Sequence, residues 1–136
     1  MKINNKEIKT SPWFKLVGIK LDNRLSFVLH ISEMIKTAGA KLNAIKRLKN
    51  RLDIIDRKIL INAHVMSHLN YCSTVWHFCG KVEIHKLEKL QERCIRFIYS
   101  DYTTEYFEIL KNNECKTLYA KRISAVCCEI YKTKIS

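Results

Sequence analysis

The sequence predicts a mainly α protein, a small helical bundle that follows a short N-terminal β-hairpin or strand. The chain has 136 residues with only three Gly and one Pro, too few for a turn-rich β-sandwich. After residue 25, apolar residues recur at three- and four-residue steps, which is the period of an amphipathic helix. A β-type pattern is confined to the start of the chain. We therefore expect two segments, a β segment at residues 1–24 and a helical domain at residues 25–136.

The N-terminal segment combines a turn signal with a β-rich run. Ile3 and Ile8 flank Asn4 and Asn5, and asparagine tolerates the positive φ angles of a tight turn. In the run WFKLVGIKL, residues 13–21, both alternating sets of side chains are apolar. A strand that is apolar on both faces needs cover on both sides. We expect a strand that is incompletely covered and that supports self-association of the chain.

Residues 25–52 are predicted to form one long amphipathic helix. Asp53 is the expected N-cap of a second helix that begins at Ile54 and continues to Leu69. Apolar residues cover most of the circumference of this second helix, so we predict that it is the central one. The apolar stripe of the first helix consists of Phe27, Ile31, Met34, Ile35, Ala38, Leu42, Ile45, Leu48 and Leu52.

Three further helices are expected in the second half of the chain. A short helix that carries Phe107 and Leu110 is expected between two longer ones. The first of the longer helices has the stripe Ile84, Leu87, Leu90, Cys94, Phe97 and Ile98, and the last has Leu118, Ile123, Val126, Cys127 and Ile130.

The charge pattern favours a polyanionic partner. Lys and Arg total 25 against 13 Asp and Glu, a formal net charge of +12, which attracts nucleic acid first and anionic membrane surfaces second. A solvated basic surface without any ligand is the alternative. Residues 36–51 carry basic residues and no acid. On a continuous helix, Lys36, Arg47 and Arg51 would lie within about 60° of each other, opposite the apolar stripe. Together with cations of the third helix, the predicted nucleic-acid contacts are Lys36, Lys46, Arg47, Arg51, Lys89 and Arg93.

The stretch HLNYCSTVWHFCG, residues 68–80, contains potential metal ligands. His68, Cys72, His77 and Cys79 suffice for zinc by number. Within the stretch, however, neither the C-x2-4-C nor the H-x3-5-H spacing occurs. A Cys/His nucleophile pair would also lack an orienting third group and an oxyanion loop. We therefore predict no metal site and no catalytic residue, and we expect this stretch to lie in the interior.

No membrane association is predicted. Residues 59–80 carry no charge and are long enough to span a bilayer, but Asn62, His64 and other polar residues make that costly. The N-terminal sequence MKINNKEIKT has no apolar core of a secretory signal, and six cysteines in such a chain are expected to be reduced thiols. We expect an intracellular protein, with the nucleus and the cytoplasm both open.

Four blocks of sequence lie in the order and at the spacing of a known family. LVGIKLDNRLSFVLHI, residues 16–31, resembles the LGVxLDxxLSFxxHI segment that follows the polymerase palm in non-LTR (LINE-type) retrotransposon reverse transcriptases. SHLNYCSTVWHFCG, residues 67–80, resembles their SHxNYCxxVWxFCG block. LEKLQERCIRFIYSDY, residues 87–102, is similar to their LxxLQERxLRxIYxDY helix, and CCEIYKTK, residues 127–134, to a following EIYK pattern. Val17 departs from the usual Leu before the glycine, which changes little.

The resemblance implies the last hairpin of a palm followed by a thumb-like helical domain, which grips a template–primer duplex through its backbone. Reverse transcriptases hold two Mg²⁺ ions on palm aspartates, two of them adjacent in a Y/F-x-D-D turn. Here Asp22, Asp53, Asp56 and Asp101 are isolated, so the catalytic palm is expected upstream of Met1.

As an isolated chain the protein is therefore expected not to be an enzyme. No cofactor is expected either, because Mg²⁺ belongs to a complete polymerase. The implied partner is the backbone of an RNA–DNA or DNA duplex, bound weakly and without sequence preference, which agrees with the charge. The alternative is a small basic helical protein-interaction module with no role in nucleic-acid binding.

Overall fold

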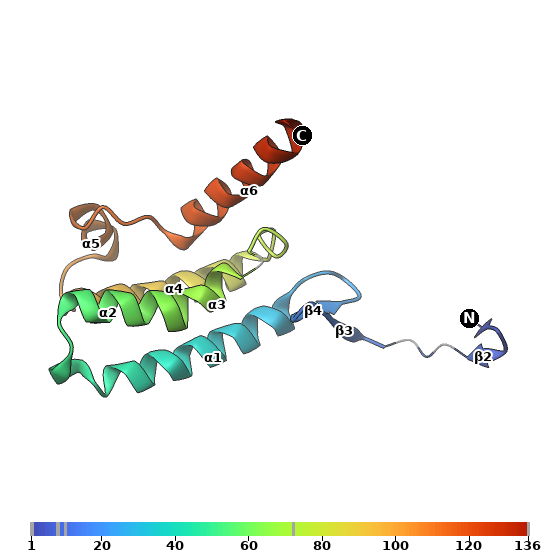
Figure 1. Ribbon diagram of the computed structural model, residues 1–136, viewed down its shortest axis with the longest axis horizontal. Helices are drawn as coiled ribbons and strands as arrows, with labels where there is room; N and C mark the ends of the chain where they lie inside the picture. Colours follow the sequence, from blue (N-terminus) through green and yellow to red (C-terminus); the bar gives the residue numbers. More distant parts are fainter. Residues whose placement is uncertain (1, 8, 10, 72, 136) are drawn as a thin grey trace.

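The computed structural model describes residues 2–7, 9, 11–71 and 73–135, and it is mainly helical (Figure 1). This confirms the predicted fold class, a mainly α bundle that follows a short β segment. The elements in chain order are β1 (Lys2–Ile3), β2 (Lys6–Glu7), β3 (Trp13–Leu16), β4 (Ile19–Asp22), α1 (Val28–Lys46), a 3-10 helix (Lys49–Arg51), α2 (Ile54–Ile61), a π-helical segment (Asn62–Met66), α3 (Ser67–Asn70), α4 (Lys81–Tyr99), α5 (Tyr106–Asn112) and α6 (Leu118–Ile135).

The predicted turn at the start of the chain is confirmed. Strands β1 and β2 pair antiparallel, and the two residues between them, Asn4 and Asn5, have φ angles of 48° and 61°. Positive φ at both central positions is the requirement of a type I′ hairpin turn. Ile8, which was expected to follow this turn, lies outside the described residues.

Residues 13–21 form a hairpin, β3–β4, which is the hairpin alternative of the predicted β-hairpin or strand. The chain reverses at Val17 and Gly18, whose φ angles are 50° and 81°. A glycine adopts such an angle without steric cost. The Tyr71 hydroxyl donates a hydrogen bond of 2.8 Å to the carbonyl oxygen of Val17, which ties the turn to the helical domain.

The hairpin register gathers the apolar side chains on one face. The pairs are Trp13 with Asp22, Phe14 with Leu21, Lys15 with Lys20, and Leu16 with Ile19. Residues that pair across a hairpin lie on the same face of it. The two-residue turn therefore places the apolar residues of both strands, Phe14, Leu16, Ile19 and Leu21, on one face. Ile19 is buried, but Phe14 and Leu16 are each 55% exposed. The expected incomplete cover is therefore confirmed, although it concerns one face of a hairpin.

The main core lies between α1, α4 and the helical stretch from α2 to α3. Helices α1 and α4 run in the same direction, and the stretch from α2 to α3 runs in the opposite direction (Figure 1). The fully buried side chains of this core come from these elements, from the loop before α4 and from the start of α6: Ile31, Ala38, Leu42, Ile61, Val65, Leu69, Trp76, Leu87, Cys94, Phe97 and Leu118.

Helix α1 ends at Lys46, so the prediction of one helix through residue 52 is wrong. The reason lies in the start of the next helix. The Asp53 side chain accepts a hydrogen bond of 2.7 Å from the backbone N–H of Asp56 and is the N-cap of α2, as predicted. An N-cap has an extended backbone, and Leu52 before it is also extended. The chain must therefore leave the helical conformation before this point.

The first half of the second predicted helix is not central, which corrects another prediction. In α2, Ile54, Ile55 and Ile59 are all exposed, Ile55 by 67%. The second half matches the prediction, since Val65 and Leu69 are buried. Apolar residues all round a helix therefore do not ensure cover on all sides, because α1 and α4 pack on one side of α2 only.

The C-terminal helices contribute little to the main core, and Leu118 of α6 is the one residue there that belongs to it among those described. The short α5 contributes Ile109 and Leu110 to a small second cluster with Ile95 of α4. The last predicted helix is confirmed as α6, which projects away from the bundle (Figure 1). Its buried residues are Leu118 and Arg122, both near its N-terminal end.

The prediction that residues 68–80 lie in the interior is confirmed in part. Trp76 is completely buried, and His77 and Cys79 are also buried. Phe78, by contrast, is 85% exposed, and Cys72 lies outside the described residues. Within the described part of the chain, none of the helices has the length and apolar character needed to cross a membrane.

Candidate nucleic-acid interface

The turn before α1 is fixed by one carboxylate. Asp22 Oδ1 accepts hydrogen bonds from the backbone N–H groups of Arg24 and Ser26, at 3.0 and 2.9 Å, and Oδ2 accepts one from the Ser26 hydroxyl. The bonds from Ser26 hold the pKa of Asp22 below its usual range. Asp22 thus fixes the direction in which α1 leaves the hairpin.

The corner after α1 is braced by Arg57 of α2. Its Nη2 donates to the Lys49 carbonyl oxygen at 3.1 Å and its Nη1 to the Ser100 hydroxyl at 2.6 Å. The guanidinium also lies 5.5 Å from the centre of the Phe97 ring. Arg57 therefore holds the 3-10 helix against the C-terminal end of α4, which brings the cations of two helices together.

Three cations meet where α1 and α4 adjoin. Arg93 Nη2 of α4 donates to Asn43 Oδ1 of α1 at 3.2 Å. Lys46 is half-buried beside this contact, and its pKa is lowered first by burial and then by the positive charges of Arg93 and Lys49. Lys49 also has its ammonium 5.2 Å from the centre of the Tyr102 ring. Mutual repulsion at this point would be relieved by an anion.

The same two helices carry further cations on the same faces. Lys36 precedes Asn43 by seven residues and Lys86 precedes Arg93 by seven, so each lies two helical turns, about 10 Å, further back on its helix. Because α1 and α4 run in the same direction (Figure 1), these two lysines extend the basic surface along both helices. We call the complete set the cationic seam: Lys36, Lys46, Lys49, Lys86 and Arg93. Among the described residues, the seam has no acidic partner within ion-pair distance.

The predicted contact residues divide into two groups. Lys36, Lys46 and Arg93 belong to the cationic seam. Arg47 is exposed and is the C-cap of α1, whereas Arg51 lies in the separate 3-10 helix. The predicted alignment of these cations on one helix face is therefore wrong for Arg51, because it assumed a helix that continues to residue 52.

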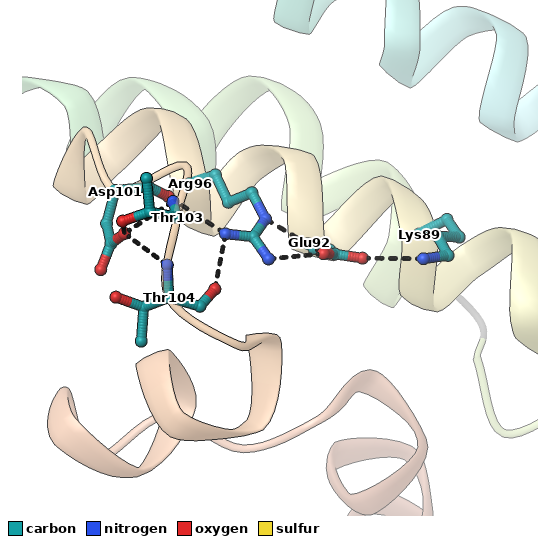
Figure 2. Close-up of polar contacts among 6 residues, drawn as sticks. All are labelled: Lys89, Glu92, Arg96, Asp101, Thr103 and Thr104. Carbon is teal, nitrogen blue, oxygen red and sulfur yellow. Dashed lines mark hydrogen bonds and ion pairs between the residues drawn. The ribbon is translucent and has the colours of Figure 1, made fainter.

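Lys89 lies in α4 beside an acidic partner (Figure 2). It pairs with Glu92 at 3.2 Å, and Glu92 also accepts from Arg96 Nε and Nη2 at 3.0 and 2.8 Å. Arg96 Nη1 in turn donates to the Thr104 carbonyl oxygen at 2.9 Å, and Asp101 Oδ1 caps the same turn by accepting from the Thr104 N–H. This network fixes the α4–α5 turn, and its carboxylate reduces the charge that Lys89 offers to a ligand.

Sequence inspection missed Asn43 and Lys49 as members of the site. Lys49 was visible as part of the acid-free run, but its approach to α4 depends on the corner braced by Arg57. Asn43 carries no charge, and only its tertiary contact with Arg93 identifies it. No pattern along the chain would have revealed either role.

His68, at the start of the predicted interior stretch, has a structural partner. His68 Nε2 accepts a hydrogen bond of 2.6 Å from the Lys41 ammonium, and burial lowers the pKa of His68. In the part of the chain that the structure describes, no group of three or more His, Cys, Asp and Glu side chains is arranged to hold a metal ion.

Comparison of the chain with family models, with curated proteins and with solved structures found no match. The functional interpretation therefore depends on the residues and their geometry.

Proposed function

We propose that this chain is a thumb-like segment, resembling that of a non-LTR retrotransposon reverse transcriptase, which binds the backbone of a nucleic-acid duplex through the cationic seam. The observation that carries the proposal is the meeting of Lys46, Lys49 and Arg93, which have no acidic partner among the described residues. The partner is an RNA–DNA or DNA duplex. The chain itself performs no polymerisation, because the paired metal-binding aspartates of that family have no counterpart in its sequence.

The chemistry of the seam suits phosphates and does not suit base recognition. Phosphates recur regularly along a duplex, so cations at two levels of two parallel helices engage several of them without contacting base edges. If two to four phosphates are neutralised, the logarithm of the binding constant should fall against the logarithm of salt concentration with a slope of roughly −2 to −4. Binding should be weak and independent of sequence.

The test is fluorescence anisotropy with a labelled RNA–DNA hybrid across a salt series. The variant Lys46→Gln/Arg93→Gln removes two cations from the centre of the seam. We expect it to weaken binding by at least about tenfold at low salt and to make the salt slope shallower by about 2, one for each lost phosphate contact.

The matched control is Lys111→Gln/Lys134→Gln, which removes the same charge from exposed positions of α5 and α6. It should lower the affinity slightly, through the smaller net charge, and leave the slope unchanged. Equal losses of slope in both double variants would show that binding follows net charge alone and would contradict a defined interface.

A second candidate function is a protein-interaction module, and the exposed apolar surfaces favour it. Phe14 and Leu16 on the hairpin and Ile55 and Ile59 on α2 are all more than half exposed, and such surfaces mark contacts with other proteins. Under this hypothesis the chain self-associates through the hairpin. Light scattering after size-exclusion chromatography, with Phe14→Ser/Leu16→Ser as the disrupting variant, tests it. Self-association that persists at high salt while duplex binding is absent would favour the second function over the first.

A further inference from the structure

Arg122, near the start of α6, is a buried cation. The residue is 3% exposed, and among the described residues none of its three side-chain nitrogens, Nε, Nη1 and Nη2, has a hydrogen-bond partner. An arginine stays charged in proteins. Burying a charge without a compensating partner is strongly unfavourable. A counter-ion would therefore stabilise Arg122 at this position.

Aromatic rings surround this guanidinium. It lies 5.3 Å from the centre of the buried Trp76 ring and 5.8 Å from that of Tyr119. The His77 ring lies 5.7 Å from Tyr119, and its Nδ1 is also buried without a partner. Phe78 meets His77 edge-on at 4.9 Å and is almost fully exposed. The unsatisfied side chains of Arg122 and His77 therefore both lie next to the partly exposed Tyr119. The exposed Phe78 lies beside His77.

The acids of the chain do not supply the missing counter-ion. Glu88 is the carboxylate whose charge acts on Arg122, but it forms no ion pair with it among the described contacts. Its oxygens accept instead from the Tyr106 hydroxyl at 3.1 Å and from the backbone N–H of Tyr119 at 2.7 Å. A ligand is thus a better source of the negative charge than a rearranged side chain.

We propose that Arg122 and His77 form a binding site for the phosphate group of a nucleotide or of a phosphorylated nucleic-acid end, reached when the Tyr119 side chain turns outward. The guanidinium fork matches phosphate oxygens in a bidentate manner, and His77 adds a second donor. Tyr119 is 44% exposed, so its ring already borders the solvent that a ligand would come from. The rings of Tyr119 and Phe78 then offer stacking surfaces for a base, which a simple carboxylate ligand would leave unused. This site is separate from the cationic seam and does not depend on it.

The full chain with Trp13→Phe provides the assay, because Trp76 is then the one tryptophan left and it lies against Arg122. Adenosine 5′-monophosphate, inorganic phosphate and adenosine are titrated at constant ionic strength, with tryptophan emission and melting temperature as readouts. We expect saturable changes with both phosphate probes, tighter for the nucleotide, and none with adenosine. Equal affinity for both phosphate probes would overturn the role of the aromatic rings. Absence of any response to them, up to 10 mM, would overturn the site.

Arg122→Met removes the charge and keeps the apolar stem. It should raise the melting temperature of the ligand-free chain and weaken nucleotide binding by at least about tenfold, the loss expected for hydrogen bonds to a charged group. Lys121→Met, the neighbouring exposed cation, should change neither. A lower melting temperature for Arg122→Met, or an unchanged nucleotide affinity, would show that Arg122 already has its partner within the chain.

Tyr119→Ala tests the cover at a surface position. Because it opens the site, inorganic phosphate should bind more tightly, while the advantage of the nucleotide over phosphate should shrink. Unchanged affinities for both probes would contradict the proposed route to Arg122.

Discussion

Helices α1 and α6 are nearly equal in length, 19 and 18 residues, and both are amphipathic, but they are held in different ways. Six residues of α1 are buried, from His30 to Ile45, and they pack against α4 and the stretch from α2 to α3. In α6 the buried residues are Leu118 and Arg122, and the second half of the helix, which includes Ile130, is exposed.

The difference shows what an apolar stripe does and does not determine. Periodicity is enough to predict both helices, because both bring apolar residues to one face. Most of the stability of a helix in a protein, however, comes from packing that face against a partner. Within the described part of the chain, helix α1 has buried residues along its length, whereas α6 has them only near its beginning. The same signal in the sequence therefore marks a core element in one case and a largely exposed helix in the other.

The largest expected effect of this difference concerns thiol reactivity. Cys94 of α4 is buried in the core that α1 covers, and burial raises its pKa to about 12, whereas Cys127 of α6 is exposed. The reactive species is the thiolate, and Cys94 reaches reagent only when the core opens. We expect iodoacetamide to modify Cys127 at least about 1,000 times faster than Cys94 at pH 8. Mass spectrometry of the peptides gives both rates.

The denatured chain is the control, because both cysteines should then react at similar rates. If the native rates differed by less than tenfold, the core would open as readily as α6 does, and the contrast between the two helices would not hold.

The second effect is on the free energy of unfolding. Leu42 of α1 is completely buried and Ile130 of α6 is 62% exposed. Leu42→Ala should lower the stability by about 2–5 kcal/mol, because it leaves a cavity, whereas Ile130→Ala should change it by less than about 0.5 kcal/mol. Urea unfolding followed by circular dichroism measures both. A large loss with Ile130→Ala would reveal a partner for α6, such as a second copy of the chain, and the loss should then depend on protein concentration.

The fold was predictable from the sequence wherever one local signal was sufficient. The Asn4–Asn5 turn, the Asp53 cap and the stripes of α1 and α4 are such cases. Val17 is a contrary case, since a β-branched residue rarely adopts a positive φ angle, and no local signal marked the position of this two-residue turn. The exposure of Ile55 also depends on which sides of α2 receive neighbours, and that is a tertiary property.

The candidate site was predictable only in part, for the same reason. An acid-free run indicates positive potential without regard to geometry, so Lys36 and Lys46 were found from the sequence. The role of Arg51 was inferred from helical phase and failed when the helix ended early. The role of Asn43 depends on its contact with Arg93 of α4, and that of Lys49 on the corner braced by Arg57. No period within one helix encodes either contact.

The smallest effect is on the pH dependence of stability, and it concerns His30 of α1. His30 is buried, and its pKa is lowered by burial first and then by the positive charge of Lys20, while Glu33 acts in the opposite direction. An unfolded histidine titrates near pH 6.5. Between this value and the lower pKa of the folded state, the unfolded chain binds more protons than the folded chain. Stability therefore rises with pH in this window and is lost as the pH falls below about 6.5.

Urea midpoints at pH 7.5 and pH 5.5 measure this loss, and the lower limit avoids most carboxylate titration, which lies near pH 4. His30→Gln should reduce the loss without abolishing it, because His68 and His77 also have lowered pKa values. Helix α6 contains no histidine, so Tyr131→His, at an exposed position, is the matched control. A histidine at this position is exposed to solvent in both the folded and the unfolded state, so its pKa should hardly change on unfolding. The pH dependence of stability should therefore equal that of the original chain. The contrary result is a larger loss of stability at low pH for Tyr131→His than for the original chain. It would show that the second half of α6 is packed against a partner in solution. Helices α1 and α6 would then both be buried and would differ in what buries them.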